Sequence, residues 1–157
     1  MSWGESQIPF MLIIGLVLLG ATVSQAIDPE EAHYNVVVTL YNKGQCEAAL
    51  KKIDEREAVN LSDDMRRKYQ YARGLALEKS GRADTARPVY EALIQKDPSS
   101  AESQKARLAI LFMDAQAGKH EAVQKGYAEI RQDALSPADR QDMTVLAAES
   151  HAASGHT

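Results

Sequence analysis

Polar and apolar positions divide the chain into an uncharged N-terminal stretch and a longer part with helical periodicity. No charge occurs between residues 6 and 27, and an apolar run extends from about Ile8 to Val23. Beyond residue 28, apolar side chains recur at spacings of three and four among charged ones, as in amphipathic helices. The stretch most like a strand, Val36-Val37-Val38-Thr39, lies inside a longer helical pattern. The sequence therefore predicts an all-α fold.

Helix start signals and glycines punctuate this periodic part at regular intervals. Each start signal offers a side-chain oxygen that can cap a helix N-terminus: Asp28, Ser62, Asp97 with Ser100, and Ser136. Glycines suited to the left-handed position after a helix follow one another every 37 residues: Gly44, Gly81, Gly118 and Gly155. A second helix is expected after each of the first three glycines, at roughly 46–57, 83–96 and 120–134, with Pro88 bending the second of these or delaying its start.

Such self-similarity is typical of a solenoid, in which each unit is one helical hairpin stacked on the next. The expected domain spans residues 27–157, with repeats at about 30–61, 62–98 and 99–135 and a capping helix at 136–155. The capping helix covers the third hairpin, and its polar side carries Asp139, Arg140, Asp142 and Glu149.

The motif residues of the second unit are Gly74, Ala76, Leu77, Gly81, Ala86, Tyr90, Leu93 and Pro98. The first unit has Val36, Leu40, Gly44, Ala49 and Ile53, and the third has Ile110, Gly118, Val123, Tyr127 and Ile130. This pattern resembles the tetratricopeptide repeat (TPR) family, and the resemblance implies a TPR-like α-solenoid. The chain departs from the family in its longer period, since the family repeats every ~34 residues. It also departs in the large Val37 and Leu111 at small-residue positions and in Arg56 at an apolar position.

In proteins of this family the first helix of each hairpin lines a concave face. The resemblance implies a partner-binding groove formed by Tyr34, Val38, Tyr41, Lys68, Tyr71, Leu75, Lys79, Lys105, Leu108 and Phe112. Glu78, Gln116, Val145 and Glu149 extend the same inward positions. An apolar, aromatic strip edged by lysines would suit an amphipathic helix or an extended peptide. The alternative is that several of these residues, Leu75 and Leu108 above all, pack only against neighbouring helices.

Composition favours binding over chemistry. The formal net charge is −4 with no basic block, so nucleic acid is not an expected partner. The single cysteine, Cys46, allows neither an intramolecular disulfide nor a cysteine zinc cluster and is interpreted as a buried apolar residue. The four histidines form no metal-binding pair, and His33 is expected to pack in the core. No nucleotide-binding or hydrolase motif is present, so we expect no enzyme, cofactor or metal.

The N-terminal stretch predicts export. Its apolar run of about 16 residues lies between a signal-peptide core and a full membrane span. Ser24 and Ala26 suit cleavage after Ala26, whereas the lack of Lys or Arg before the apolar run, where Glu5 lies, argues against a signal peptide. Residues 1–26 are therefore either a cleaved signal or an uncleaved anchor through residues 8–23. The domain is expected in the periplasm, or anchored on the outer side of the cytoplasmic membrane.

Two functions remain open from these patterns. The first is a non-catalytic scaffold that binds a protein or peptide segment in the bacterial cell envelope and assists assembly of a complex. The alternative is a small structural subunit of a membrane protein complex, held by an uncleaved N-terminal helix.

Overall fold

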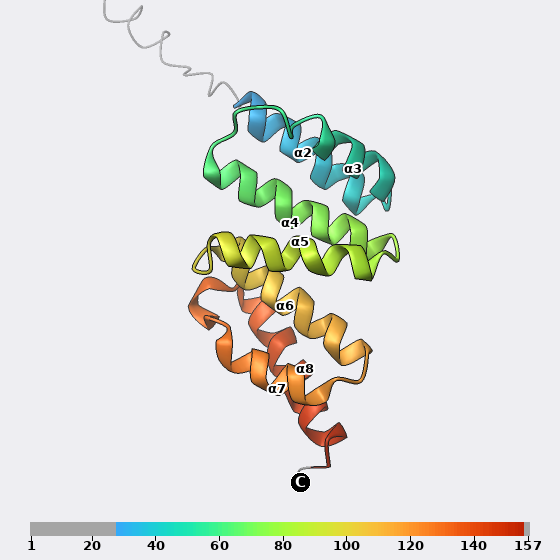
Figure 1. The fold of residues 1–157 in the computed structure, drawn as a ribbon, viewed down its shortest axis with the longest axis vertical. Coiled ribbons are helices and arrows are strands. Elements are labelled where there is room, and N and C mark those ends of the chain that lie inside the picture. The colour runs from blue at the N-terminus through green and yellow to red at the C-terminus, as the bar shows by residue number, and fades with distance from the viewer. Residues whose placement is uncertain (1–27, 156–157) are drawn as a thin grey trace, which may run out of the picture.

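The computed structural model describes residues 28–155, all of whose regular structure is helical. The helices are α2 (Pro29–Asn42), α3 (Cys46–Asp54), α4 (Asp63–Lys79), α5 (Ala83–Lys96), α6 (Ala101–Gln116), α7 (His120–Glu129) and α8 (Pro137–Ala153), with a short 3-10 helix at Gln132–Ala134 (Figure 1). The signal or anchor predicted at residues 1–26 lies outside the described residues. Between residues 28 and 155, no helix combines the length and apolarity needed to cross a bilayer.

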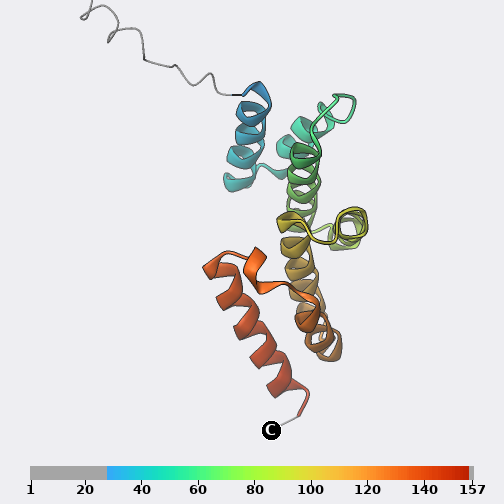
Figure 2. The same ribbon diagram turned by 90° about the vertical axis from the view of Figure 1, so that its left-hand side faces the viewer.

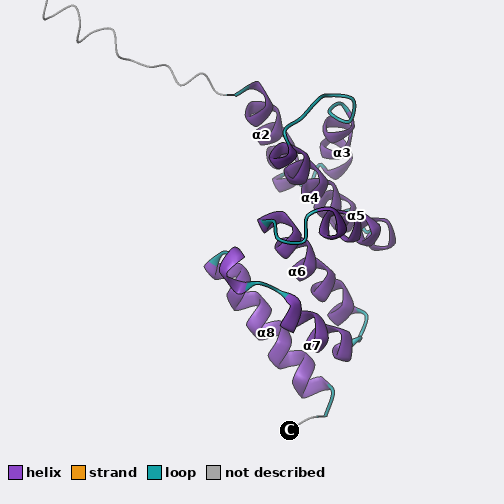
Figure 3. Ribbon diagram, turned by 60° about the vertical axis from the view of Figure 1, so that its left-hand side comes forward, coloured by secondary structure: helices purple, strands orange, loops and turns teal. Residues whose placement is uncertain are grey.

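The helices pack in sequence as three hairpins and one final helix. Each helix contacts the next, and α2 with α4, α4 with α6 and α6 with α8 also pack together. Figure 2 shows α2 and α8 on the same side of α4 and α6, with α5 on the opposite side. Figure 3 shows α8 beside the third hairpin. The all-α fold of sequentially packed hairpins predicted from the sequence is confirmed.

The helix boundaries follow local capping chemistry. The side chains of Asp28, Ser62, Ser100 and Ser136 each accept a hydrogen bond from a backbone N–H of the first turn. The four periodic glycines adopt positive φ angles of 74°, 80°, 70° and 75°. Because a side chain in this conformation costs roughly 1–2 kcal/mol, glycine suits the turn that ends α2, α4, α6 and α8. The left-handed glycines predicted from their period are confirmed.

The second helices of hairpins one and three, α3 and α7, end earlier than the sequence predicts. A turn ends α3, and a contact with another helix ends α7. After α3 the chain tightens into turns, with Arg56 N donating to the carbonyl of Ile53 at 2.9 Å. After α7, Ile130 is extended and buried, and Arg131 N donates to Gln104 Oε1 at 2.8 Å rather than to a helical carbonyl. Pro88 lies inside α5 without delaying its start at Ala83.

The core consists of two apolar clusters that share α6. The first joins α2, α3, α4 and α5 to Ala106, Ala109 and Met113 of α6, and the second joins α6, α7 and α8. Cys46 is buried in the first cluster, as predicted. Val36 was predicted as a motif residue of the first unit, but its side chain does not pack in the core: Val36 is 45% exposed, whereas Val37 is 1% exposed. The orientation of α2 therefore places Val37 in the core.

His33 has a structural role in the first hairpin. It is half-buried, and its Nδ1 lies 2.8 Å from the hydroxyl oxygen of Tyr69 on α4. Its Nε2 lies 3.6 Å from a carboxylate oxygen of Glu55. These contacts link α2 to α4 and to the turn after α3, in line with the packing role predicted for this histidine.

Candidate binding groove

A cavity of about 250 Å³ lies between α4, α6 and α8, which we call the α4–α6–α8 groove. Its lining comes from three helical faces with spacings of three and four, and consists of Tyr71, Leu75, Glu78, Lys105, Leu108, Ala109, Phe112, Gln116, Asp139 and Asp142. The first helices of hairpins two and three thus form its floor with the final helix as one wall.

Half of the ten predicted groove residues line this cavity: Tyr71, Leu75, Lys105, Leu108 and Phe112. Leu108 is only 5% exposed and belongs to the second core cluster, so it forms floor and core at once. Leu75 is half-buried and belongs to neither cluster. Leu75 therefore contributes less to the packing of the core than the other apolar side chains of the groove.

The three predicted residues of α2 do not line this cavity. Tyr34 meets the ring of Tyr69 edge-on, with centroids 5.4 Å apart. Tyr34 and Tyr41 both pack against the first core cluster, and burial raises the pKa of both hydroxyl groups. Val38 is half-buried on the same helix. Tyr34 and Tyr41 contact Tyr69 and Lys79 and thereby hold α2 on α4.

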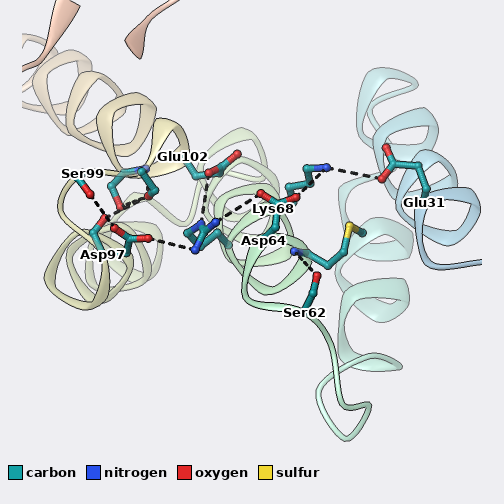
Figure 4. Close-up of polar contacts among 11 residues, drawn as sticks. Glu31, Ser62, Asp64, Lys68, Asp97, Ser99 and Glu102 are labelled. Carbon is teal, nitrogen blue, oxygen red and sulfur yellow. Dashed lines mark hydrogen bonds and ion pairs between the residues drawn. The ribbon is translucent and has the colours of Figure 1, made fainter. Parts of the chain in front are cut away.

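Two of the three predicted lysines are engaged in contacts within the fold. Lys68 Nζ lies 3.1 Å from a carboxylate oxygen of Asp64 and 3.6 Å from one of Glu31, which ties α4 to α2 (Figure 4). Lys79 Nζ donates to the carbonyl of Tyr41 at 3.1 Å and lies 4.3 Å from the centroid of its ring. The lysine edge expected from the sequence is therefore reduced to Lys105 in this cavity.

The wall that α8 forms is acidic, which the sequence reasoning missed, although it did place Glu78 of α4 at an inward position. Asp139 and Asp142 on α8 face the cavity together with Glu78 on α4, whereas the sequence placed both aspartates on the outer polar side of the capping helix. A signal was present: Asp142 precedes the inward position Val145 by one helical turn and therefore shares its face. Val145 itself is 50% exposed.

Two tyrosines interact with the acidic residues at the groove, Tyr71 through charge and Tyr90 through a hydrogen bond. Burial and then the charge of Asp139 raise the pKa of Tyr71. Tyr90 is fully buried under α4, and its hydroxyl donates to Glu78 Oε2 at 3.0 Å; burial and the Glu78 charge raise its pKa. Glu78 is therefore held at the groove by a hydrogen bond from the core.

Among residues 28–155, no three His, Cys, Asp or Glu side chains gather in a way that could hold a metal ion. What the groove offers is an aromatic and aliphatic floor beside carboxylates, which is a surface for apolar and cationic side chains.

An arginine at the other end of α4 fixes the relation between hairpins two and three. Arg67 lies 3.1 Å from a carboxylate oxygen of Asp97, before α6, and 3.7 Å from one of Glu102 on α6. It also lies 3.4 Å from Asp64 on its own helix. These ion pairs hold α4 beside α6, and so position the two helices that form the floor.

Comparison with known protein families bears on this same region. The family model of the tetratricopeptide repeat matches residues 67–111, from α4 through α5 into α6. The chain carries a tetratricopeptide repeat. The matched segment supplies most of the groove floor, including Tyr71, Leu75, Lys105 and Leu108. No curated protein and no solved structure matches the chain.

Proposed function

We propose that this repeat-containing protein is a non-catalytic scaffold that binds a segment of another protein in the α4–α6–α8 groove. Tetratricopeptide repeats generally serve protein–protein interaction, and the matched repeat forms the floor of the groove. The observation that carries the proposal is Leu75, an apolar side chain that lines the cavity without belonging to either core cluster. A half-buried apolar side chain of this kind becomes favourable when a partner covers it.

We place this scaffold in the bacterial cell envelope, where it assists assembly of a complex. The uncharged stretch from residue 6 to residue 27, with Ser24 and Ala26 at its end, supports export. The domain then lies in the periplasm, or stays anchored to the cytoplasmic membrane with the domain outside. The apolar run of residues 8–23 favours a second candidate, a structural subunit held in a membrane complex by the uncleaved segment.

The groove is tested with Leu75→Gln, which removes apolar surface and leaves both core clusters intact. Val59→Gln is the matched control, because Val59 is 37% exposed and does not line the groove. The full-length tagged chain is captured from gently solubilised membranes, and helicity is checked by circular dichroism. We expect a stoichiometric, salt-resistant partner with the wild type and with Val59→Gln, and a loss of about tenfold or more with Leu75→Gln, since interface anchors contribute ~2 kcal/mol. Equal capture by all three chains would sink the groove assignment.

The intact mass of the captured bait separates the two envelope models. A bait that lacks residues 1–26 is expected for the exported adaptor. A full-length bait accompanied by integral membrane proteins, and indifferent to Leu75→Gln, would instead establish the structural subunit.

A further inference from the structure

We propose that the segment bound in the α4–α6–α8 groove is cationic: an amphipathic peptide whose apolar anchor lies on the floor and whose Lys or Arg side chains meet the acidic wall. This inference rests on the proposed function, because it specifies the chemistry of the partner for the same groove. It also revises the lysine-edged strip that was expected from the sequence, because only Lys105 of those lysines lines the cavity.

The charges of the lining carry the argument. Three carboxylates, Glu78, Asp139 and Asp142, line the cavity with one cation, Lys105. Asp142 is exposed, and neither it nor Lys105 makes an ion pair within the described part of the chain. Asp139 accepts hydrogen bonds from the backbone N–H and the hydroxyl group of Ser136 in the capping box of α8. The groove therefore presents an excess of negative charge that no neighbouring side chain neutralises.

Other cations near the groove are held elsewhere. Lys79 follows Glu78 along α4 but donates to the carbonyl of Tyr41. Arg140 follows Asp139 along α8 but donates to the carbonyls of Gln132 and Leu135. Because these cations are engaged, the acidic wall is complementary to a cation that arrives with a partner.

The floor fits such a partner in size and kind. A volume of about 250 Å³ is below the roughly 300–1,000 Å³ usual for small-molecule pockets, and instead suits one or two side chains of a peptide. Tyr71 and Phe112 supply aromatic surface beside the carboxylates, and such rings attract both aliphatic groups and Lys or Arg cations. An apolar anchor flanked by basic residues satisfies both parts of the groove.

Two other occupants are less complementary. Residues 1–27 of this chain are apolar but contain no Lys or Arg, and Glu5 adds a negative charge. A second copy brings a formal net charge of −4, so its approach to an acidic wall is opposed. Charge therefore favours a different, basic segment over the chain itself.

The test uses three labelled 16-residue peptides that share one Leu and Phe stripe at helical spacing. Their remaining positions are Lys-rich, Ser- and Gln-rich, or Glu-rich, and binding to the full-length chain in mild detergent is followed by fluorescence anisotropy. We expect the Lys-rich peptide to bind about tenfold more tightly than the Glu-rich one at low salt, with the difference shrinking as salt screens the charges.

A charge reversal then localises the effect. Asp142→Lys is expected to weaken the Lys-rich peptide roughly fivefold, in the range of exposed ion pairs that act together, and to leave the neutral peptide nearly unchanged. The matched control is Glu91→Lys on α5, an exposed acid that does not line the groove, which should leave every affinity within about twofold of the wild type.

The outcomes distinguish this inference from the function on which it rests. Equal binding of all three peptides, lost in Leu75→Gln, would keep the groove and overturn its cationic preference. If none of the three peptides binds, the cationic preference is overturned, and the groove is instead filled by a second copy or by the chain's own N-terminal segment. Light scattering would then separate a second copy from the chain's own N-terminal segment. Capture of a natural partner that depends on Leu75 would decide the scaffold function independently.

Discussion

Two glycines face large side chains across the second and third hairpins. A Cβ added to Gly74 on α4 would overlap the ring of Tyr90 on α5, and one added to Gly126 on α7 would overlap a methyl group of Leu111 on α6. In hairpin two the small residue is on the first helix, and in hairpin three it is on the second. The large Leu111, which departs from the family pattern, is thus accommodated by a glycine on its partner helix, because a packed core conserves total volume.

Replacement of Gly74 by Ala is predicted to destabilise the fold. The added methyl group meets a rigid, fully buried ring, and overpacking of this kind costs about 1–3 kcal/mol, which exceeds the ~0.5–1 kcal/mol that Ala gains over Gly in a helix. Urea denaturation should therefore show a lower free energy of unfolding. Gly126→Ala is the control, since the end of a Leu side chain can rotate away, and it should cost clearly less. A Gly74→Ala variant at least as stable as Gly126→Ala would contradict this account.

Helix starts were predictable from sequence because capping is local, whereas the ends of α3 and α7 were not. A Ser or Asp cap needs only its own first turn, as at Ser62 and Ser136. The end of α7 depends instead on Gln104, a buried residue of α6 that accepts from Arg131 N and donates to the carbonyl of Pro98 at 2.7 Å. The sequence near residue 130 does not indicate a hydrogen bond to a residue 27 positions away.

A partly buried ion pair, in which Asp114 is buried and the Arg87 side chain is 28% exposed, joins hairpin two to hairpin three and gives a prediction for α5 and α6. Asp114 on α6 is 7% exposed, and its carboxylate lies 2.6 Å from Arg87 Nη2 and 3.7 Å from Lys119 Nζ. Arg87→Ala leaves that carboxylate with the more distant, exposed lysine alone. Because an uncompensated buried charge is costly, we expect a loss of roughly 2–3 kcal/mol in the free energy of unfolding.

The control for Arg87→Ala is Lys52→Ala, which breaks the Lys52–Glu55 pair of α3, both of whose side chains are at least 40% exposed. That exposed pair should contribute less than about 0.5 kcal/mol. Chemical denaturation of both variants measures the difference. Similar losses in the two variants would mean that Asp114 is solvated in solution and that the α5–α6 contact is held by apolar packing alone.

For the whole molecule, the floor of the groove followed from sequence but its wall did not. Tyr71, Leu75, Leu108 and Phe112 lie on first helices whose inward face is set by the repeat. The wall depends on how α8 is rotated about its axis, and burial of Met143 and Leu146 against hairpin three sets that rotation. Spacings of three place Asp139, Asp142 and Val145 on one helical face, but which residues of that face line the cavity depends on how α8 packs against the third hairpin.

Alkaline pH is predicted to destabilise the molecule through its buried tyrosines. The pKa values of Tyr71 and Tyr90 are raised above the ordinary 10.0, first by burial and then by Asp139 or Glu78. The folded state therefore favours the neutral hydroxyl groups. Their contribution to stability is complete below pH 10 and is lost as pH rises above it, because the unfolded chain then releases protons that the folded chain retains, by up to about 1.4 kcal/mol per pH unit for each group.

Tyr71→Phe isolates this effect, because Tyr71 makes no hydrogen bond through its hydroxyl group within residues 28–155. The free energy of unfolding is measured by urea titration between about pH 8 and pH 11.5, and tyrosinate absorbance is followed in parallel. The variant should lose less stability than the wild type above pH ~10, while the two run parallel below it, since only the ionisation of Tyr71 differs between them. Lysine deprotonation weakens both proteins alike and cancels in the comparison. Curves that stay parallel to the highest pH would mean that the Tyr71 hydroxyl is hydrated in the open groove.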